Sequence, residues 1–128
     1  MKRTGVITPH FTWEEAQCRC GCDMPESIAA EVLITAGWLE HVRSELGNVP
    51  MFITSWYRCE EYNKRVGGVP TSFHLLGQAV DFVQKEPSPG MVQHALLRLW
   101  PKLVKGLGRY AGFTHIDRRS GEAQMWGG

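Results

Sequence analysis

Residues 72–81, SFHLLGQAVD, place an imidazole and a carboxylate seven positions apart. They belong to His74 and Asp81, and a second imidazole, His115, follows on a later apolar segment. Residues 78–83 alternate as expected for a β-strand. Two histidines and one carboxylate suit zinc, and three protein ligands rather than four leave a position open for water, as in catalytic zinc sites. The sequence therefore predicts one catalytic Zn²⁺ bound by His74, Asp81 and His115.

The segments around this stretch carry alternating helix and strand patterns. Apolar residues recur at helical spacing in two segments, and the strand segments are short and rich in β-forming residues. The predicted elements are a helix over 26–46, a strand over 51–57, a helical turn at 60–65, a strand over 78–83, a helix over 88–100, and short strands at 107–110, 113–117 and 123–126. Residues 1–25 are predicted to be irregular, with a capping box formed by Asp23 and Glu26. This order predicts an α+β fold, with helices packed on a small antiparallel sheet.

Size and composition exclude several classes of protein. With 128 residues, of which 43% are hydrophobic and 21% charged, the chain has the profile of one ordinary globular domain over residues 1–128. A formal net charge of +1 argues against broad electrostatic capture of nucleic acid. No stretch approaches the 18 or so consecutive apolar residues of a membrane span. We expect a monomer that binds neither nucleic acid nor membrane.

The amino terminus carries two basic residues, Lys2 and Arg3, without an apolar segment behind them. A secretory signal peptide needs such a segment. The sequence therefore predicts a protein that is cytoplasmic when it is made.

Three further residues are candidates for roles beside the metal. His115 and Asp117 are two apart and share a face of their strand, so Asp117 is a candidate general acid/base or a partner that orients a histidine. Arg58 follows a strand and can offer positive charge to a substrate carboxylate or an oxyanion. Ser72 can donate a hydrogen bond to substrate.

Each assignment has a structural alternative. Arg58 can pair with Glu60 or Glu61, an arrangement that is common and weak at protein surfaces. Asp117 can serve as a partner for Arg118 or Arg119. His74 and His115, taken singly, can be a turn-capping histidine and a core histidine.

The sequence resembles the zinc D-alanyl-D-alanine carboxypeptidase family, which includes phage endolysins that cut the L-alanyl-D-glutamate bond and relatives of the vancomycin-resistance dipeptidases. The family signature Ser-x-His-x-x-Gly-x-Ala-x-Asp matches residues 72–81 throughout, and His115 fits the third metal ligand. Residues 53–58, ITSWYR, and residues 62–70, YNKRVGGVP, add to the likeness. The resemblance runs from about residue 11 to residue 126.

This resemblance implies a single-domain zinc metallopeptidase, with a hedgehog- or D,D-peptidase-like fold, that hydrolyses peptide bonds in peptidoglycan stem peptides. It also implies a phage- or prophage-encoded lytic domain, which reaches the cell wall after release or from a virion. Several branches of the family place the catalytic acid three residues before the last histidine, where this chain has Gly112. The alternative is therefore a catalytically inactive, zinc-stabilised binding domain for cell wall or protein, a role that related hedgehog domains show for this scaffold.

Four cysteines remain outside this scheme. Cys18, Cys20 and Cys22 alternate, and Cys59 follows Arg58. Structural zinc sites usually carry Cys-x-x-Cys pairs, so this spacing is a weak metal signal. We expect reduced thiols that pin the amino-terminal segment; a disulfide to Cys59 and a second, structural metal site are the alternatives.

Overall fold

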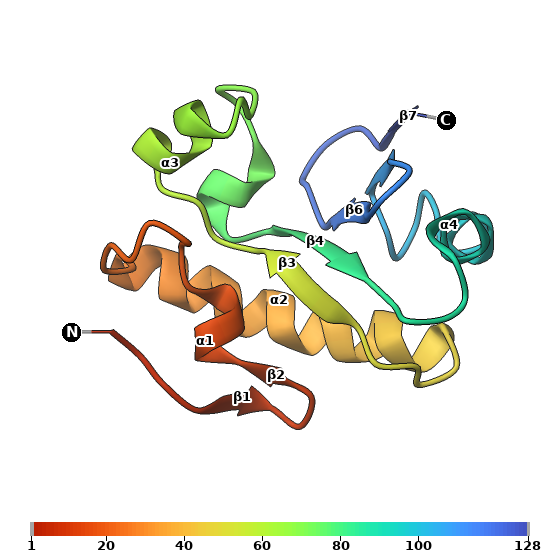
Figure 1. The fold of residues 1–128 in the computed structure, drawn as a ribbon, viewed down its shortest axis with the longest axis horizontal. Coiled ribbons are helices and arrows are strands. Elements are labelled where there is room, and N and C mark those ends of the chain that lie inside the picture. Colours follow the sequence, from red (N-terminus) through yellow and green to blue (C-terminus); the bar gives the residue numbers. More distant parts are fainter. Residues whose placement is uncertain (1, 128) are drawn as a thin grey trace.

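The computed structural model describes residues 2–127, which form two sheets and four α-helices in an α+β arrangement (Figure 1). The predicted fold class is confirmed. The elements in chain order are β1 (Val6–Thr8), β2 (Phe11–Thr12), α1 (Trp13–Ala16), α2 (Glu26–Glu45), β3 (Phe52–Ser55), α3 (Glu60–Arg65), the 3₁₀ helix η1 (Phe73–Leu76), β4 (Ala79–Val83), α4 (Pro89–Leu96), β5 (Gly106–Arg109), β6 (Thr114–Asp117) and β7 (Gln124–Gly127).

The main sheet has five strands in the order β3-β4-β6-β5-β7. All neighbouring pairs are antiparallel except β5 and β7, which are parallel. The expectation of a purely antiparallel group is therefore wrong for the last strand. Gly106 pairs with both Asp117, the last residue of β6, and Gln124, the first residue of β7, so β7 starts at the end of the sheet where β6 ends. It therefore runs against β6 and along β5.

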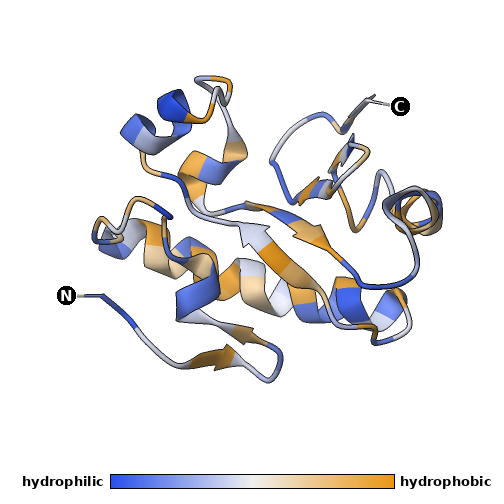
Figure 2. Ribbon diagram, in the orientation of Figure 1, coloured by the Kyte–Doolittle hydropathy of each residue, from blue (hydrophilic) through white to orange (hydrophobic). Residues whose placement is uncertain are grey.

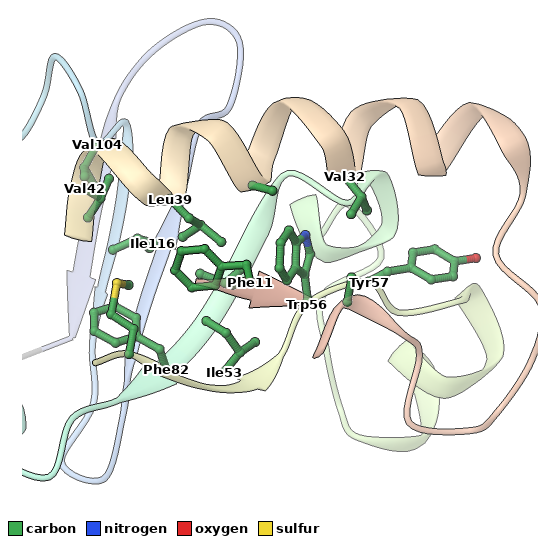
Figure 3. Packing of buried hydrophobic residues seen from close by; sticks show 14 of the residues in the cluster. Phe11, Val32, Leu39, Val42, Ile53, Trp56, Tyr57, Phe82, Val104 and Ile116 are labelled. Atoms are coloured by element: carbon green, nitrogen blue, oxygen red, sulfur yellow. The ribbon is translucent and has the colours of Figure 1, made fainter. Parts of the chain in front are cut away.

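Helix α2 covers one face of this sheet and supplies a continuous buried stripe (Figure 3). Val32, Ala36, Leu39 and Val42 recur at three- and four-residue steps and have no exposed surface. They pack in one hydrophobic cluster with sheet residues such as Phe82 and Ile116. Figure 2 shows the contrast between the apolar central strands and the hydrophilic α3. The opposite face of the sheet is left for the functional residues.

The ends of α2 show one correct and one wrong prediction. The helix begins after Pro25, without a side-chain cap, so the predicted capping box of Asp23 and Glu26 is wrong. It stops at Leu46, and Gly47 and Asn48 both adopt positive φ, at 87° and 62°, as expected for a helix stop.

The amino-terminal segment is more ordered than predicted. Strands β1 and β2 pair into a small antiparallel sheet, and Thr12 and Glu15 form a capping box at the start of α1. Phe11 is buried and meets the Trp56 ring edge-on at a centroid distance of 6.3 Å. Strands of two and three residues are too short to produce a periodic sequence pattern, which explains why the prediction missed them.

Helix α4 begins as predicted, with the Ser88 hydroxyl accepting a hydrogen bond from the Met91 amide, but it ends at Leu96 rather than near residue 100. Trp100 precedes Pro101, and a residue before proline is disfavoured in helical conformation. Within residues 2–127, we find no helix with the length and apolar character that a membrane span requires.

Candidate metal centre

The face of the main sheet opposite α2 carries a row of residues in register across all five strands. Ser55 pairs with Asp81, Asp81 with His115, His115 with Gly108, and Gly108 with Trp126. Cross-strand partners project from the same face of a sheet. The register therefore brings Asp81 and His115, which are 34 residues apart in sequence, side by side.

His74 reaches this row from η1, which lies just before β4. The Ser72 hydroxyl caps η1 by accepting a hydrogen bond from the His74 amide at 3.2 Å. Gly77 ends it in the left-handed region, at φ 70°, where a side chain would also approach Val32 within 3.1 Å. This tight turn explains why a glycine stands between the histidine and the strand that carries Asp81.

The three predicted ligands meet at one point. His74 Nε2 lies 3.1 Å from Asp81 Oδ1, and His115 Nδ1 lies 2.9 Å from the same oxygen. One donor atom from each of the three residues lies within 4.8 Å of the others, and all three residues are buried. The structure thus brings the predicted ligand set together.

The remaining nitrogen of each imidazole is held by a hydrogen-bond acceptor. His74 Nδ1 lies 2.6 Å from the Trp56 carbonyl, and His115 Nε2 lies 2.8 Å from Asp117 Oδ2. In the neutral form of each ring, these acceptors hold the proton on the outer nitrogen and leave the inner nitrogen with a free lone pair. Metal-binding histidines in proteins show this arrangement.

The electrostatics of His74 and Asp81 agree with cation binding, whereas burial would lower the pKa of His115 but hydrogen bonds to Asp117 and Asp81 outweigh it and raise that pKa. Burial lowers the pKa of His74, which keeps its ring neutral. Burial would raise the pKa of Asp81, but the neighbouring His115 and His74 outweigh it and hold that pKa well below its usual value. An ionised carboxylate oxygen and two imidazole nitrogens directed at one point fit Zn²⁺.

Asp117 lies behind His115 and has no exposed surface. Besides His115, it accepts hydrogen bonds from Arg119 Nε at 2.8 Å and Nη2 at 2.7 Å. Burial would raise the pKa of Asp117, but Arg119 and His115 outweigh this and lower it to about 2. A carboxylate this acidic is a poor proton carrier at neutral pH. The geometry therefore favours the orienting role considered for Asp117 over the predicted acid/base role.

Two glycines in β5 make room for this arrangement. A Cβ on Gly106 would stand 2.1 Å from Asp117 Oδ2, and a Cβ on Gly108 would stand 2.8 Å from the Trp126 indole. Trp126 uses that space to lie against His115, with ring centroids 5.0 Å apart. Leu107 between them is buried in the core. Gly106 and Gly108 thus place no side chain on the functional face of β5, whereas Leu107 places its side chain in the core.

Arg58 contacts the ligand carboxylate rather than Glu60 or Glu61. Its Nη2 donates to Asp81 Oδ2 at 3.1 Å, its Nε to Ser55 Oγ at 3.1 Å, and its Nη1 to Asn63 Oδ1 at 3.3 Å. The guanidinium therefore holds the second oxygen of Asp81 and leaves the first oxygen directed at the histidines.

A cleft of about 590 Å³ opens over the three ligands. The predicted site residues Arg58 and Ser72 line it, together with Arg119 and several aromatic side chains that the sequence analysis did not assign. The aromatic residues are Phe73, Tyr110, Phe113 and Trp126. Among the described residues that line the cleft, the only carboxylate is Asp81.

Phe73, Tyr110, Phe113 and Trp126 form what we call the aromatic wall of the cleft. Side-chain contacts link these residues and Arg119. Tyr110 stacks on Phe113 with centroids 4.4 Å apart, and Trp126 Nε1 donates to the Tyr110 hydroxyl at 2.9 Å. The Arg119 guanidinium lies over the Phe73 ring at 4.4 Å. The four aromatic residues come from three separate segments of the chain, so they can be recognised as one wall only in the folded structure.

Comparison with known proteins decides the family. A family model described as Peptidase M15 matches residues 9–117 of the 128-residue chain. The chain belongs to the peptidase M15 family. M15 peptidases are zinc-dependent, and the matched range includes all three residues of the candidate centre. A search of curated proteins found no match to the chain.

Proposed function

We propose that this M15 chain is a zinc peptidase that hydrolyses peptide bonds in the stem peptides of bacterial peptidoglycan. His74, Asp81 and His115 bind one catalytic Zn²⁺ at the floor of the cleft. The observation that carries the proposal is the convergence of two buried imidazole nitrogens on one carboxylate oxygen. The other nitrogen of each ring is held by a hydrogen-bond acceptor, the Trp56 carbonyl for His74 and Asp117 for His115.

The bound Zn²⁺ would polarise the scissile carbonyl and lower the pKa of a water molecule to about 7. The protein's own residues fix the geometry around it. Asp117 holds the proton on His115 Nε2, the Trp56 carbonyl holds the proton on His74 Nδ1, and Arg58 restrains the carboxylate of Asp81. Loss of a residue that orients a metal ligand in this way typically lowers metal affinity by about 10- to 100-fold.

The cleft suits a short peptide with small side chains and a terminal or side-chain carboxylate. Arg58 and Arg119 contribute positive charge at its walls, and Ser72 contributes a hydroxyl. The aromatic wall offers an apolar surface for alanine methyl groups. Both a D,D-carboxypeptidase and an endolysin-type endopeptidase would cleave a bond within such a stem. We propose that the protein acts as a monomer on the cell wall, after release from the cytoplasm or from a virion.

The test is mass spectrometry of soluble fragments released from purified peptidoglycan by the zinc-loaded protein. A chelated sample and the Asp81→Asn variant should release none, whereas His94→Ala, at an exposed position of α4, should behave as wild type. Fragment masses identify the bond that is cut. Release that persists after chelation and in Asp81→Asn would refute the proposal.

One observation favours a second candidate function, a catalytically inactive zinc-stabilised domain that binds cell wall or protein. Among the described residues that line the cleft, no carboxylate other than the proposed ligand Asp81 is present to transfer protons. This candidate predicts that the zinc-loaded, folded protein co-sediments with peptidoglycan and releases no fragments. Fragment release by the same preparation would exclude it.

A further inference from the structure

The four cysteines gather at one place on the molecule. Cys18, Cys20 and Cys22 come from the loop that follows α1, and Cys59 is the N-cap of α3, 37 positions after Cys22 (59 − 22). The Sγ atoms of Cys18 and Cys20 are 3.3 Å apart, those of Cys20 and Cys59 are 3.6 Å apart, and those of Cys18 and Cys59 are 3.8 Å apart. All four sulfur atoms lie within 4.8 Å of one another.

These separations match a tetrahedral metal site. With a zinc–sulfur bond of about 2.3 Å, the sulfur atoms of a tetrahedral tetrathiolate are about 3.8 Å apart. A disulfide requires about 2.05 Å, and all four cysteines are free thiols in the structure. Four thiols that only pack against one another would not need to place all four sulfur atoms around one point.

The backbone around the thiols also fits a metal centre. Cys18, Cys20 and Cys59 each accept a backbone N–H through sulfur at 3.4 Å, from Cys59, Cys22 and Tyr62 respectively. Such hydrogen bonds stabilise negative charge on sulfur. With Zn²⁺ and four thiolates the site carries a net charge of −2.

The intervening residues of the loop hold the three clustered sulfurs in place. Gly21 adopts φ 85° and donates its N–H to the Cys18 carbonyl at 3.0 Å, which closes a tight turn between the cysteines. Arg19 projects the other way and donates to the carbonyls of Ile53 and Thr54 at 3.3 Å. The alternation Cys-x-Cys-x-Cys therefore turns three thiols inward while Arg19 ties the loop to β3.

We propose that Cys18, Cys20, Cys22 and Cys59 bind a second Zn²⁺ with a structural role. The four thiols lose their protons to solvent as four Zn–S bonds form, with no oxidation or reduction. Four protein ligands leave no open position, so this ion would not take part in catalysis.

The position of this ion explains what it would do. Cys59 directly follows Arg58, whose guanidinium holds Asp81. Binding of the ion would join the amino-terminal segment to the start of α3 and restrain the backbone next to Arg58. The spacing alone gave only a weak metal signal, because the fourth ligand comes close only through the fold.

The test is the zinc content of the purified full-length protein, measured by inductively coupled plasma mass spectrometry. We expect two ions per chain in the wild type, one in Asp81→Asn and one in Cys20→Ser, whose side chain is exposed and whose loss is least disruptive to the core. A Co²⁺-substituted sample should show sulfur-to-cobalt charge-transfer absorption in the wild type and in Asp81→Asn, with the band weakened in Cys20→Ser.

This experiment tests the histidine site and the cysteine site separately. Loss of zinc from the histidine site in Asp81→Asn leaves the cobalt–sulfur band intact if the cysteine site is real. Absence of that band in a folded wild-type protein, or a chain mass that shows disulfides among these cysteines in freshly purified protein, would overturn the proposal. Neither result would bear on the catalytic centre.

Discussion

Substitution of Gly106 by alanine should damage the candidate metal centre although the residue contacts no ligand of the metal. An added Cβ would stand 2.1 Å from Asp117 Oδ2 and 2.3 Å from both Cγ and Oδ1. Ordinary contact begins near 3.4 Å, so the carboxylate must move by about 1.3 Å (3.4 − 2.1). Its hydrogen bonds to His115 and Arg119 are 2.8 and 2.7 Å long, and such a shift stretches them beyond 3.5 Å.

The expected cost has two parts. Overpacking of a well-packed site typically costs about 1–3 kcal/mol in unfolding free energy. Breaking the pairing of a buried carboxylate costs about 3–5 kcal/mol, so the two parts together come to about 4–8 kcal/mol. Because Asp117 orients His115, zinc affinity should fall by about 10- to 100-fold.

Urea denaturation and competitive zinc titration of the same samples measure both effects. Gly112→Ala is the matched control, because it lies in the turn of the same hairpin and a Cβ there would meet nothing within 4 Å. In an Asp117→Ala background, Gly106→Ala should cost much less, since the clash is gone. Equal costs in both backgrounds, or wild-type zinc affinity in the single variant, would refute the reasoning.

Three further predictions concern the core, a helix–sheet tether and the ligand carboxylate. Leu39→Ala, at a fully buried position, should lower the unfolding free energy by about 2–5 kcal/mol, whereas Leu33→Ala, 53% exposed on the same helix, should change it by less than about 0.5 kcal/mol. Glu31 is bound by Gln78 and by Arg118 at 2.6 Å, and both lower its pKa. Its contribution is therefore present at pH 7 and is lost as pH falls through the lowered pKa of Glu31. Glu31→Gln should cost about 0.5–1 kcal/mol at pH 7 in chelator and progressively less as the pH is lowered below the ordinary range of a glutamate, as urea denaturation will show. Arg58→Gln should weaken zinc binding by about tenfold or more in a competitive titration, with unchanged affinity refuting its role as the partner of the ligand carboxylate.

The sequence was informative wherever a local pattern was long enough to carry the prediction. Helix α2 was predicted nearly to the residue, because its apolar spacing lies within one segment, and the helical turn predicted at residues 60–65 is α3. The ligand set was predicted from its spacing, and strand register alone places Asp81 beside His115. The hairpin of β1 and β2 was missed because its strands are too short for periodicity.

Other features depend on contacts between distant segments. The burial of Asp117 follows from the missing side chain at Gly106, and this pairing is visible only once β5 and β6 are aligned. The aromatic wall of the cleft and the approach of Cys59 to the other cysteines also require the fold. A glycine opposite a buried carboxylate carries no signal in a single sequence.

The most direct test of the account is an anomalous difference map at the zinc absorption edge, from crystals of the zinc-loaded protein. The account predicts a peak within bonding distance of His74 Nε2, His115 Nδ1 and Asp81 Oδ1, with Asp117 still bound to His115 Nε2. A map without a peak between these three atoms, or with zinc bound through His74 Nδ1, would contradict it.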